Sequence, residues 1–230
     1  MDPLPSLFIS HGAPTFALEP GQLGPALNAI GARLGRPEAV VVVSPHWMTP
    51  QPQVASSQWP ETIHDFAGFD PALSEIVYPA PGHPALATRI IERLGEVGWP
   101  AQEAPGQGLD HGAWVPLRYL FPDADVPVVQ VSLPVGLNGQ SAFDFGRALA
   151  PLAKEGILLV GSGSLTHNLA DFRMGSLDLG YVEEFAGWVH DRVGASDALA
   201  VREALERAPG AQRAHPSSEH FLPLPWALGA

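Results

Sequence analysis

The sequence predicts a three-layer α/β/α fold with a largely parallel or mixed central sheet. Short, nearly continuous runs of apolar, β-branched residues recur along the chain, as is typical of strands buried on both faces of a sheet. Helical patterns lie between these runs, and strands that alternate with helices favour a parallel sheet. The length of 230 residues fits one catalytic domain over residues 1–230.

The individual elements follow in chain order. Four apolar runs are the expected strands: residues 7–9, 39–43, 126–133 and 157–160. Six segments have helical patterns: residues 22–34, 84–97, 113–121, 142–153, 181–193 and 197–208. Ser196 or Asp197 is the expected N-cap of the last helix, because a short polar side chain accepts a hydrogen bond from a free backbone N–H there. Residues 47–82, rich in Pro, Gln and Ser, are expected to form a long loop of the kind that often carries function.

Composition excludes several classes of function. The chain has 12 basic and 24 acidic residues, a net charge of −12, so it lacks the basic surface that binds nucleic acid or anionic membranes. Cysteine is absent, which excludes disulfides, thiolate zinc sites, iron–sulfur clusters and a cysteine nucleophile. The sequence has no signal-peptide pattern and no run approaching the ~20 apolar residues of a membrane helix. We therefore expect a cytoplasmic protein without nucleic-acid or membrane partners; the oligomeric state stays open.

Three of the nine histidines follow predicted strands. They are His11, His46 and His167. Ligands of open α/β sheets bind outside the carboxyl ends of the strands, so these three imidazoles are expected at one edge. Without competing cysteine, such a group predicts a metal site built from imidazole and carboxylate. The alternative is that each is an ordinary loop histidine with satisfied polar atoms.

The other histidines divide by their neighbours. His111 lies between Asp110 and a glycine, before a predicted helix, and is either a catalytic acid–base or part of a helix entry that Asp110 caps. His220 follows Glu219, and either side chain is a candidate metal ligand. His64, in the long loop, is a candidate pocket residue. His83 is expected to be structural and His190 to lie on the surface.

Common catalytic signatures are missing from the sequence. There is no HExxH zinc motif. The glycine-rich stretch at residues 161–164 has neither the lysine of a phosphate loop nor the G-x-S-x-G frame of a hydrolase nucleophile. The histidines are therefore the chief candidates for chemistry.

Six histidine-containing motifs resemble one family along the chain. They are SLFISHGAPTFAL, VVVSPHW, TIHDFAGF with the following YPAPG, GLDHGAWVPL, VGSGSLTHNL and HPSSEHFLPL. They occur in order from Ser6 to Leu224 and resemble the DODA-type (4,5-DOPA dioxygenase-like) branch of the class III, LigB-like extradiol ring-cleavage dioxygenases. Each motif is weak alone, but six in order are specific. In this family a further strand with a Tyr-Gly-Ser-like stretch follows the point that corresponds to Ala230.

The resemblance implies roles for individual residues. His11, His46, His167 and His220 match the histidines of a metal site. In the more distant LigB branch the counterpart of His167 is an acid–base near dioxygen and a glutamate is the third ligand, so His167 has two possible roles and Glu219 is a reserve for His220. His111 matches a histidine that assists the substrate or proton transfer.

The resemblance also implies the reaction. It is extradiol opening of a catechol ring with O2, on DOPA or a small catecholic acid, with Fe(II) required for activity and Zn(II) able to occupy the same ligands without redox chemistry. Aromatic side chains near the histidine motifs suit a catechol pocket, although core packing explains each one equally well. The candidates for substrate contact are His64, Phe66 and Trp114, and Trp47, Phe69 and Tyr78 lie near the same motifs. A zinc-dependent hydrolase and a metal-binding protein without enzymatic activity are the alternative functions.

Overall fold

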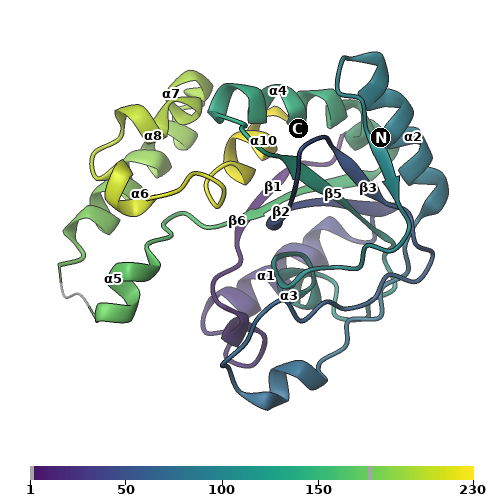
Figure 1. Ribbon diagram of the computed structural model, residues 1–230, viewed down its shortest axis with the longest axis horizontal. Coiled ribbons are helices and arrows are strands. Elements are labelled where there is room, and N and C mark those ends of the chain that lie inside the picture. Colours follow the sequence, from purple (N-terminus) through teal and green to yellow (C-terminus); the bar gives the residue numbers. More distant parts are fainter. Residues whose placement is uncertain (1–2, 176–177) are drawn as a thin grey trace.

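The computed structural model describes residues 3–175 and 178–230, built around one mixed six-stranded sheet (Figure 1). The strand order is β1-β6-β2-β5-β3-β4. Pairing is parallel throughout except between β3 and β5, which are antiparallel. The strands are β1 (Leu7–Ser10), β2 (Ala39–Thr49), β3 (Gln53–Ala55), β4 (Gln102–Ala104), β5 (Val128–Pro134) and β6 (Ile157–Gly163).

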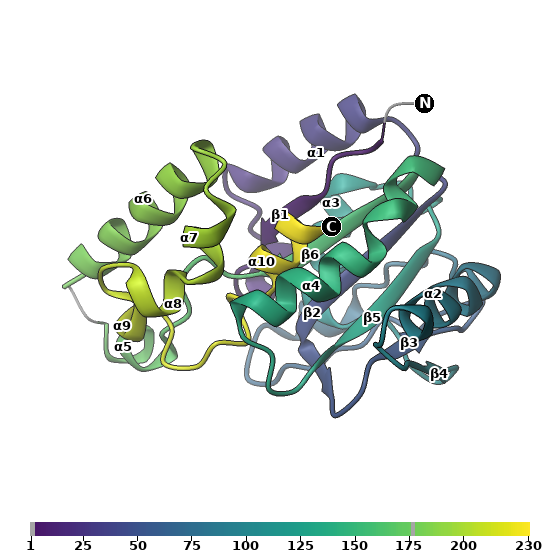
Figure 2. The same ribbon diagram turned by 90° about the horizontal axis from the view of Figure 1, so that it is seen from above.

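Helices cover both faces of the sheet, which gives the three layers (Figures 1 and 2). On one face α1 (Leu23–Leu34) and α3 (His111–Leu120) share an apolar core with alternate residues of β2 such as Val40 and Val42. On the other face α2 (Pro84–Glu96), α4 (Gly139–Leu149) and α10 (Pro223–Gly229) pack on Val41 and Val43. The period-two alternation of side chains along a strand explains why one valine run supplies both cores.

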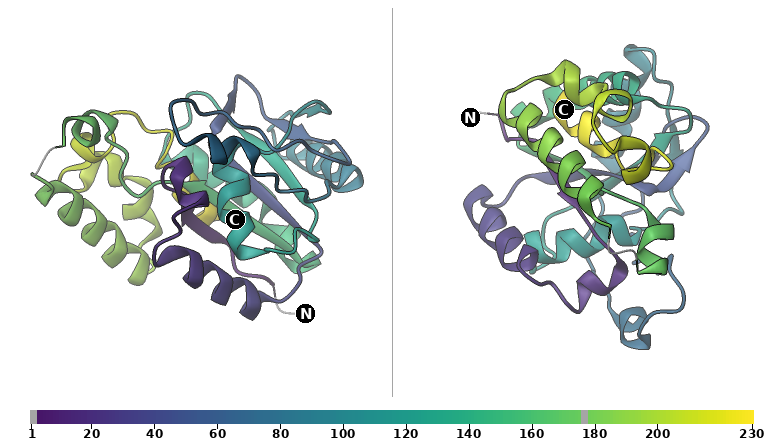
Figure 3. Two further views of the ribbon diagram at one scale, coloured as in Figure 1. Left: turned by 90° about the horizontal axis from the view of Figure 1, so that it is seen from below. Right: turned by 90° about the vertical axis from the view of Figure 1, so that its left-hand side faces the viewer.

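A group of helices stands beside the sheet (Figure 3). We call α6 (Gly180–Gly194), α7 (Ala198–Arg202), α8 (Ala204–Arg207) and α9 (Ala211–Ala214) the helical lobe. Its apolar core includes Phe185 and Val201 and extends to Phe221 and Leu224 of the chain that returns to the sheet. Helix α5 (Leu169–Met174) precedes the lobe, and three 3-10 helices complete the chain: Pro14–Ala17, Pro71–Glu75 and Ala150–Glu155.

The structure confirms the predicted fold class and corrects several elements. The four predicted strands are present, but β2 runs on to Thr49, and β3 and β4 were not predicted. Both missed strands have three residues, too short for a periodic pattern to show. Residues 47–82 are therefore not wholly loop. The predicted helix over residues 197–208 is divided into α7 and α8, and Asp197 is its N-cap, accepting a hydrogen bond from the Ala200 N–H at 3.1 Å.

Within the described residues, no helix is both long and apolar enough to cross a membrane.

Candidate metal centre

Five histidines converge at the carboxyl edge of the parallel strands. His11 follows β1, His46 lies on β2, His111 begins α3, His167 follows β6, and His220 precedes α10. The pairing of β2 with β6 stops at Val43, so His46 lies beyond the end of its neighbour although it remains within its own strand. The rule that ligands collect at strand ends places His11, His46 and His167 at one edge, and ring contacts join these three to His111 and His220 in one cluster.

A buried serine fixes the orientation of His11. The Ser162 hydroxyl, on β6, donates to the Gly112 carbonyl oxygen, and it can therefore accept from His11 Nδ1–H at 2.9 Å. This arrangement puts the proton of His11 on Nδ1 and leaves the Nε2 lone pair free. Gly112 has to be glycine for this packing, because a Cβ at this position would collide with Ser44 Oγ and lie 3.0 Å from His46 Cδ2.

The Nε2 atoms of His11 and His46 are 3.1 Å apart. That separation suits two nitrogen ligands of one ion, because metal–nitrogen bonds of about 2.1 Å at angles of about 95° put the nitrogens about 3.1 Å apart. Together with a nitrogen of His111, the ligand atoms lie within 4.8 Å of one another. His167, Glu219 and His220 form a second such group.

Ring spacings show which of these histidines fit a common ion. With bonds of about 2.1 Å, imidazole centroids lie about 3.2 Å from the metal, so ligands about 90–110° apart have centroids about 4.5–5.2 Å apart. The pairs His11–His46 and His46–His220 are separated by 5.1 Å, and His11–His220 by 5.7 Å. The centroids of His46 and His111 are 3.9 Å apart and those of His167 and His220 3.4 Å, both below this range, and the 5.7 Å of His11–His220 is above it. By ring spacing, His11, His46 and His220 come nearest to three ligands of one ion, whereas the distances between ligand atoms group His11 and His46 with His111.

A carboxylate orients His220. Its Nδ1–H donates to Glu219 Oε1 at 3.2 Å, and that oxygen also accepts from Ser217 Oγ at 2.8 Å. Histidine ligands commonly donate their second N–H to a carboxylate in this way. Glu219 is thus placed to orient its neighbour, and the Nε2 atom of His220 is the one left to bind.

Asp65 holds His111 from the long loop. One carboxylate oxygen accepts both the backbone N–H of His111 at 3.0 Å and its Nδ1–H at 2.9 Å, and the other lies 3.7 Å from His46 Nδ1. The Nε2 atom of His111 is therefore free to take a proton. Burial raises the pKa of Asp65, but the hydrogen bonds and charge of His111 outweigh it and the pKa is lowered. Asp110 caps α3 as predicted, accepting from the Ala113 N–H at 3.0 Å.

Burial keeps the central histidines neutral. Burial first, and then the His111 imidazole, lowers the pKa of His46 to about 3. Burial and then His167 lower the pKa of His220 to about 4, and burial also holds the pKa of His11 well below 6.5. Neutral imidazole is the form that binds metal, so the site is ready to take an ion near neutral pH.

His167 stands on a different support. It lies in the loop after β6, its backbone N–H donates to the Ala214 carbonyl at 2.7 Å, and its ring stacks on His220 with an interplanar angle of 9°. Burial lowers its pKa, and the Glu219 carboxylate acts in the opposite direction. A half-buried imidazole at this place suits proton transfer.

The predicted substrate residues occupy unequal positions. Phe66 lies edge-on to His111, with centroids 5.8 Å apart. His64 Nε2–H donates to the Ile76 carbonyl at 2.9 Å, and its ring lies 5.9 Å from that of Trp114. Trp114 is fully buried and donates its indole N–H to the Ile63 carbonyl at 3.0 Å. Of the three, Phe66 makes the direct ring contact with the histidine cluster.

Among the described residues, the remaining aromatic and histidine candidates make no ring contact with the five clustered histidines. Tyr78 is buried, with its hydroxyl bonded to the Phe121 carbonyl at 3.0 Å. His83 caps α2 by accepting the Leu86 N–H, and His190 is exposed, as expected for both. Trp47 is buried, and Phe69 is partly exposed with its ring centroid 5.9 Å from that of Phe66.

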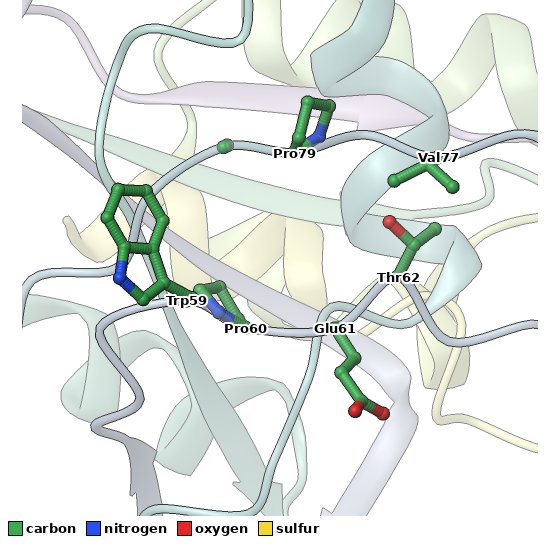
Figure 4. Close-up of a pocket in the computed structure, with 7 residues that line it drawn as sticks. Trp59, Pro60, Glu61, Thr62, Val77 and Pro79 are labelled. Atoms are coloured by element: carbon green, nitrogen blue, oxygen red, sulfur yellow. The ribbon is translucent and has the colours of Figure 1, made fainter.

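A cavity of about 410 Å³ is lined by residues 59–62, Val77, Pro79 and Ala80, and no histidine lines it (Figure 4).

Sequence reasoning missed two of the groups that orient these side chains, Asp65 and Ser162. Ser162 lies beside His11 because β1 and β6 pair in the register Ile9↔Ser162, which the sequence alone does not give. Nothing in the local sequence indicates Asp65, whose partners are 19 and 46 residues away.

Comparisons with known proteins identify the family of the chain. Residues 7–230 match the family model described as the catalytic LigB subunit of aromatic ring-opening dioxygenase. The chain is 38% identical to proteins named 4,5-DOPA dioxygenase extradiol from Escherichia coli and Beta vulgaris, covering 99% and 98% of this chain and 85% and 86% of those proteins. The crystal structure of an uncharacterized protein from Escherichia coli K12 has a TM-score of 0.74 and 33% identity, and the match covers 91% of this chain and 82% of that one.

Proposed function

Because this chain belongs to the LigB family of aromatic ring-opening dioxygenases, we propose that its histidine site binds Fe(II) and acts on a catechol with an amino-bearing side chain. The chain is a metal-dependent extradiol dioxygenase, an oxidoreductase that cleaves an aromatic ring. The family implies a catecholic substrate and O2. The metal, the residue roles and the choice among catechols form the proposal.

The ligands are His11, His46 and His220. The observation that carries this assignment is the spacing of their rings, 5.1, 5.1 and 5.7 Å, which is nearer to that of three imidazoles around one ion than the spacings of 3.9 and 3.4 Å in the closer ring pairs are. Two of the three also have a partner for the second ring nitrogen, Ser162 and Glu219 respectively. Bound Fe(II) supplies Lewis acidity towards the catechol oxygens and a redox-active centre for O2, which zinc does not.

The remaining two histidines move protons. His111 carries a proton on Nδ1, held by Asp65, so its Nε2 is the atom that accepts a proton from a catechol hydroxyl. His167 is half-buried, stacks on His220 and is the second proton carrier. The 3.4 Å stacking supports this role over metal binding, because His167 and His220 cannot share an ion at that separation.

The charges around the site favour a substrate that carries an ammonium group. The carboxylates of Asp65 and Glu219 flank the histidines, and among the described residues Glu219 is the charged group that shifts the pKa of His167. Arg213, whose backbone adjoins the His167 loop, pairs its guanidinium with Asp171 and Asp178 instead. The net charge of −12 on the whole chain also attracts a positively charged substrate. DOPA-like catechols are therefore preferred to small catecholic acids.

The aromatic contacts of the substrate divide into two roles. Phe66 contacts the catechol ring, since it lies edge-on to His111 at the site. His64 and Trp114 act behind it, holding the loop through the carbonyl oxygens of Ile76 and Ile63.

The test compares three catechols that differ in side-chain charge. Metal-free protein is reloaded anaerobically with Fe(II) or Zn(II), and O2 uptake is measured with dopamine, DOPA and 3,4-dihydroxyphenylpropionate. Uptake is expected with Fe(II) and not with Zn(II). We expect kcat/KM to be about tenfold higher for dopamine than for the propionate, because a carboxylate near the substrate attracts an ammonium group and repels a second carboxylate. A tenfold ratio corresponds to about 1.4 kcal/mol.

Each arm of this experiment has a distinct negative outcome. Equal or inverted kcat/KM for the anion would refute the charge preference while leaving the iron site intact. Protein that holds Fe(II) stoichiometrically and takes up no O2 with any of the three catechols would refute this assignment of metal and substrate. Hydrolysis of an ester by the Zn(II) form would then favour the hydrolase alternative.

A further inference from the structure

His215 is a buried histidine outside the metal cluster. It ends α9 of the helical lobe and is 6% exposed. Its ring packs edge-on against Phe185 and Phe221, with centroids 5.4 Å away in both cases. Burying an imidazole in an apolar core is costly unless it makes a hydrogen bond, so the bond that it makes identifies its use.

Among the described residues, the side chain of His215 has one hydrogen-bond partner, which lies in the loop that carries His167. Its Nε2 lies 2.8 Å from the Leu165 carbonyl oxygen, which can only accept, so Nε2 carries the proton. Nδ1 is buried and has no partner among the described residues, so it remains unprotonated. Burial also lowers the pKa of His215, in agreement with a permanently neutral donor.

The same loop has few other supports. β6 ends at Gly163, so residues 164–168 make no sheet hydrogen bonds. Three bonds attach the loop to the returning chain: Ser164 N–H to the His220 carbonyl at 2.8 Å, His167 N–H to the Ala214 carbonyl at 2.7 Å, and Asn168 Nδ2–H to the Arg213 carbonyl at 2.7 Å. The hydrogen bond from the buried ring of His215 holds the Leu165 carbonyl, two residues before His167.

We propose that His215 is a positioning residue, which holds the Leu165 carbonyl so that the ring of His167 stays stacked on His220. The proposal rests on the assignment of His167 as a proton carrier in the proposed function. The helical lobe thereby contributes to the site through one rigid side chain. A displaced His167 would slow proton transfer without altering the metal ligands, because a positioned base has to lie within hydrogen-bond reach of its proton.

Two amide substitutions of His215 distinguish loss of its hydrogen bond from loss of its ring. In His215→Gln, the amide nitrogen takes the place of Nε2 and can still donate to Leu165. In His215→Asn the amide nitrogen takes the place of Nδ1 and cannot reach it. The Asn variant is expected to lose about 10–100-fold in kcat with KM within about threefold and full Fe(II) content, and the Gln variant to recover to within about threefold of the parent.

Amide hydrogen exchange of the Zn(II)-loaded protein supplies a readout that needs no catalysis. Exchange at residues 164–168 is expected to be faster in the Asn variant and near the parent rate in the Gln variant. The control is His83→Asn, the same substitution at the N-cap of α2, where the Asn oxygen can still accept the Leu86 N–H; it should leave this exchange and kcat unchanged. Unchanged loop exchange in His215→Asn, or equal kcat in the Gln and Asn variants, would overturn the proposal. If the unsubstituted enzyme showed no dioxygenase activity, the proposed function would be refuted. The exchange experiment would still show whether His215 holds the loop of residues 164–168.

Discussion

The rings of His11 and His220 lie 5.7 Å apart, yet the two sides of the site are supported in different ways. On the sheet side, His11 and His46 follow the paired parts of parallel strands, and their backbone N–H groups donate to the Gly163 carbonyl and to Ser44 Oγ at 2.9 and 3.3 Å. On the lobe side, His167 and His220 stand on two loops held to each other by a few bonds, including those of His215 and Ser164. Many backbone hydrogen bonds hold a strand, so the loss of one side chain should move it little. A loop held by a few bonds should move when one of them is lost. We therefore expect substitutions on the lobe side to displace the histidines more easily.

The largest effect is expected when a ligand on the sheet side is removed. His46→Ala should lower metal affinity by more than about 100-fold, because even partners outside the ligand set cost 10–100-fold. The fold should survive, since Val40–Val43 remain in the sheet. Metal content after dialysis and kcat/KM measure the effect, and His190→Ala, at an exposed site, is the control. Full metal retention would show that His46 is not a ligand.

A smaller effect is expected at Asp65, which connects the long loop to the sheet side. Asp65→Asn keeps the size but removes the charge that holds His111 Nδ1–H, so kcat should fall about tenfold with normal Fe(II) content. Steady-state kinetics over a range of pH, with metal analysis, tests this prediction. A variant that loses its iron would show that the 3.7 Å contact to His46 matters more than the bond to His111.

The smallest effect concerns pH and the metal-free protein. The folded-state pKa is about 3 for His46, about 4 for His220 and lowered for His11, against 6.5 when unfolded. Stability from these groups is therefore present above pH 6.5 and is lost as the pH falls towards 4. Asp110, whose pKa burial raises to about 6, acts oppositely but alone, so the urea midpoint should be lower at pH 5 than at pH 7. An equal or higher midpoint at pH 5 would contradict this.

Much of the sheet side could be predicted from local pattern. Strand runs before His11 and His46, and the rule that strand ends converge, placed both residues at one edge. The short strands β3 and β4 and the division of residues 197–208 into two helices could not be predicted, because three- to five-residue elements depend on what they pack against. The roles of Asp65 and His215 were invisible for a related reason, since each acts through a partner far away in the chain.

The sequence by itself determined the fold class, the family and the identity of the five histidines, because buried strands and ordered motifs are local signals. Only the tertiary structure gives the distances between the five imidazole rings. Our proposal takes the three histidines whose rings are 5.1–5.7 Å apart as the ligands of one ion, and the two at spacings of 3.4 and 3.9 Å as proton carriers. The reason is geometric: coordination angles depend on distances between side chains up to 209 residues apart, which no local pattern contains.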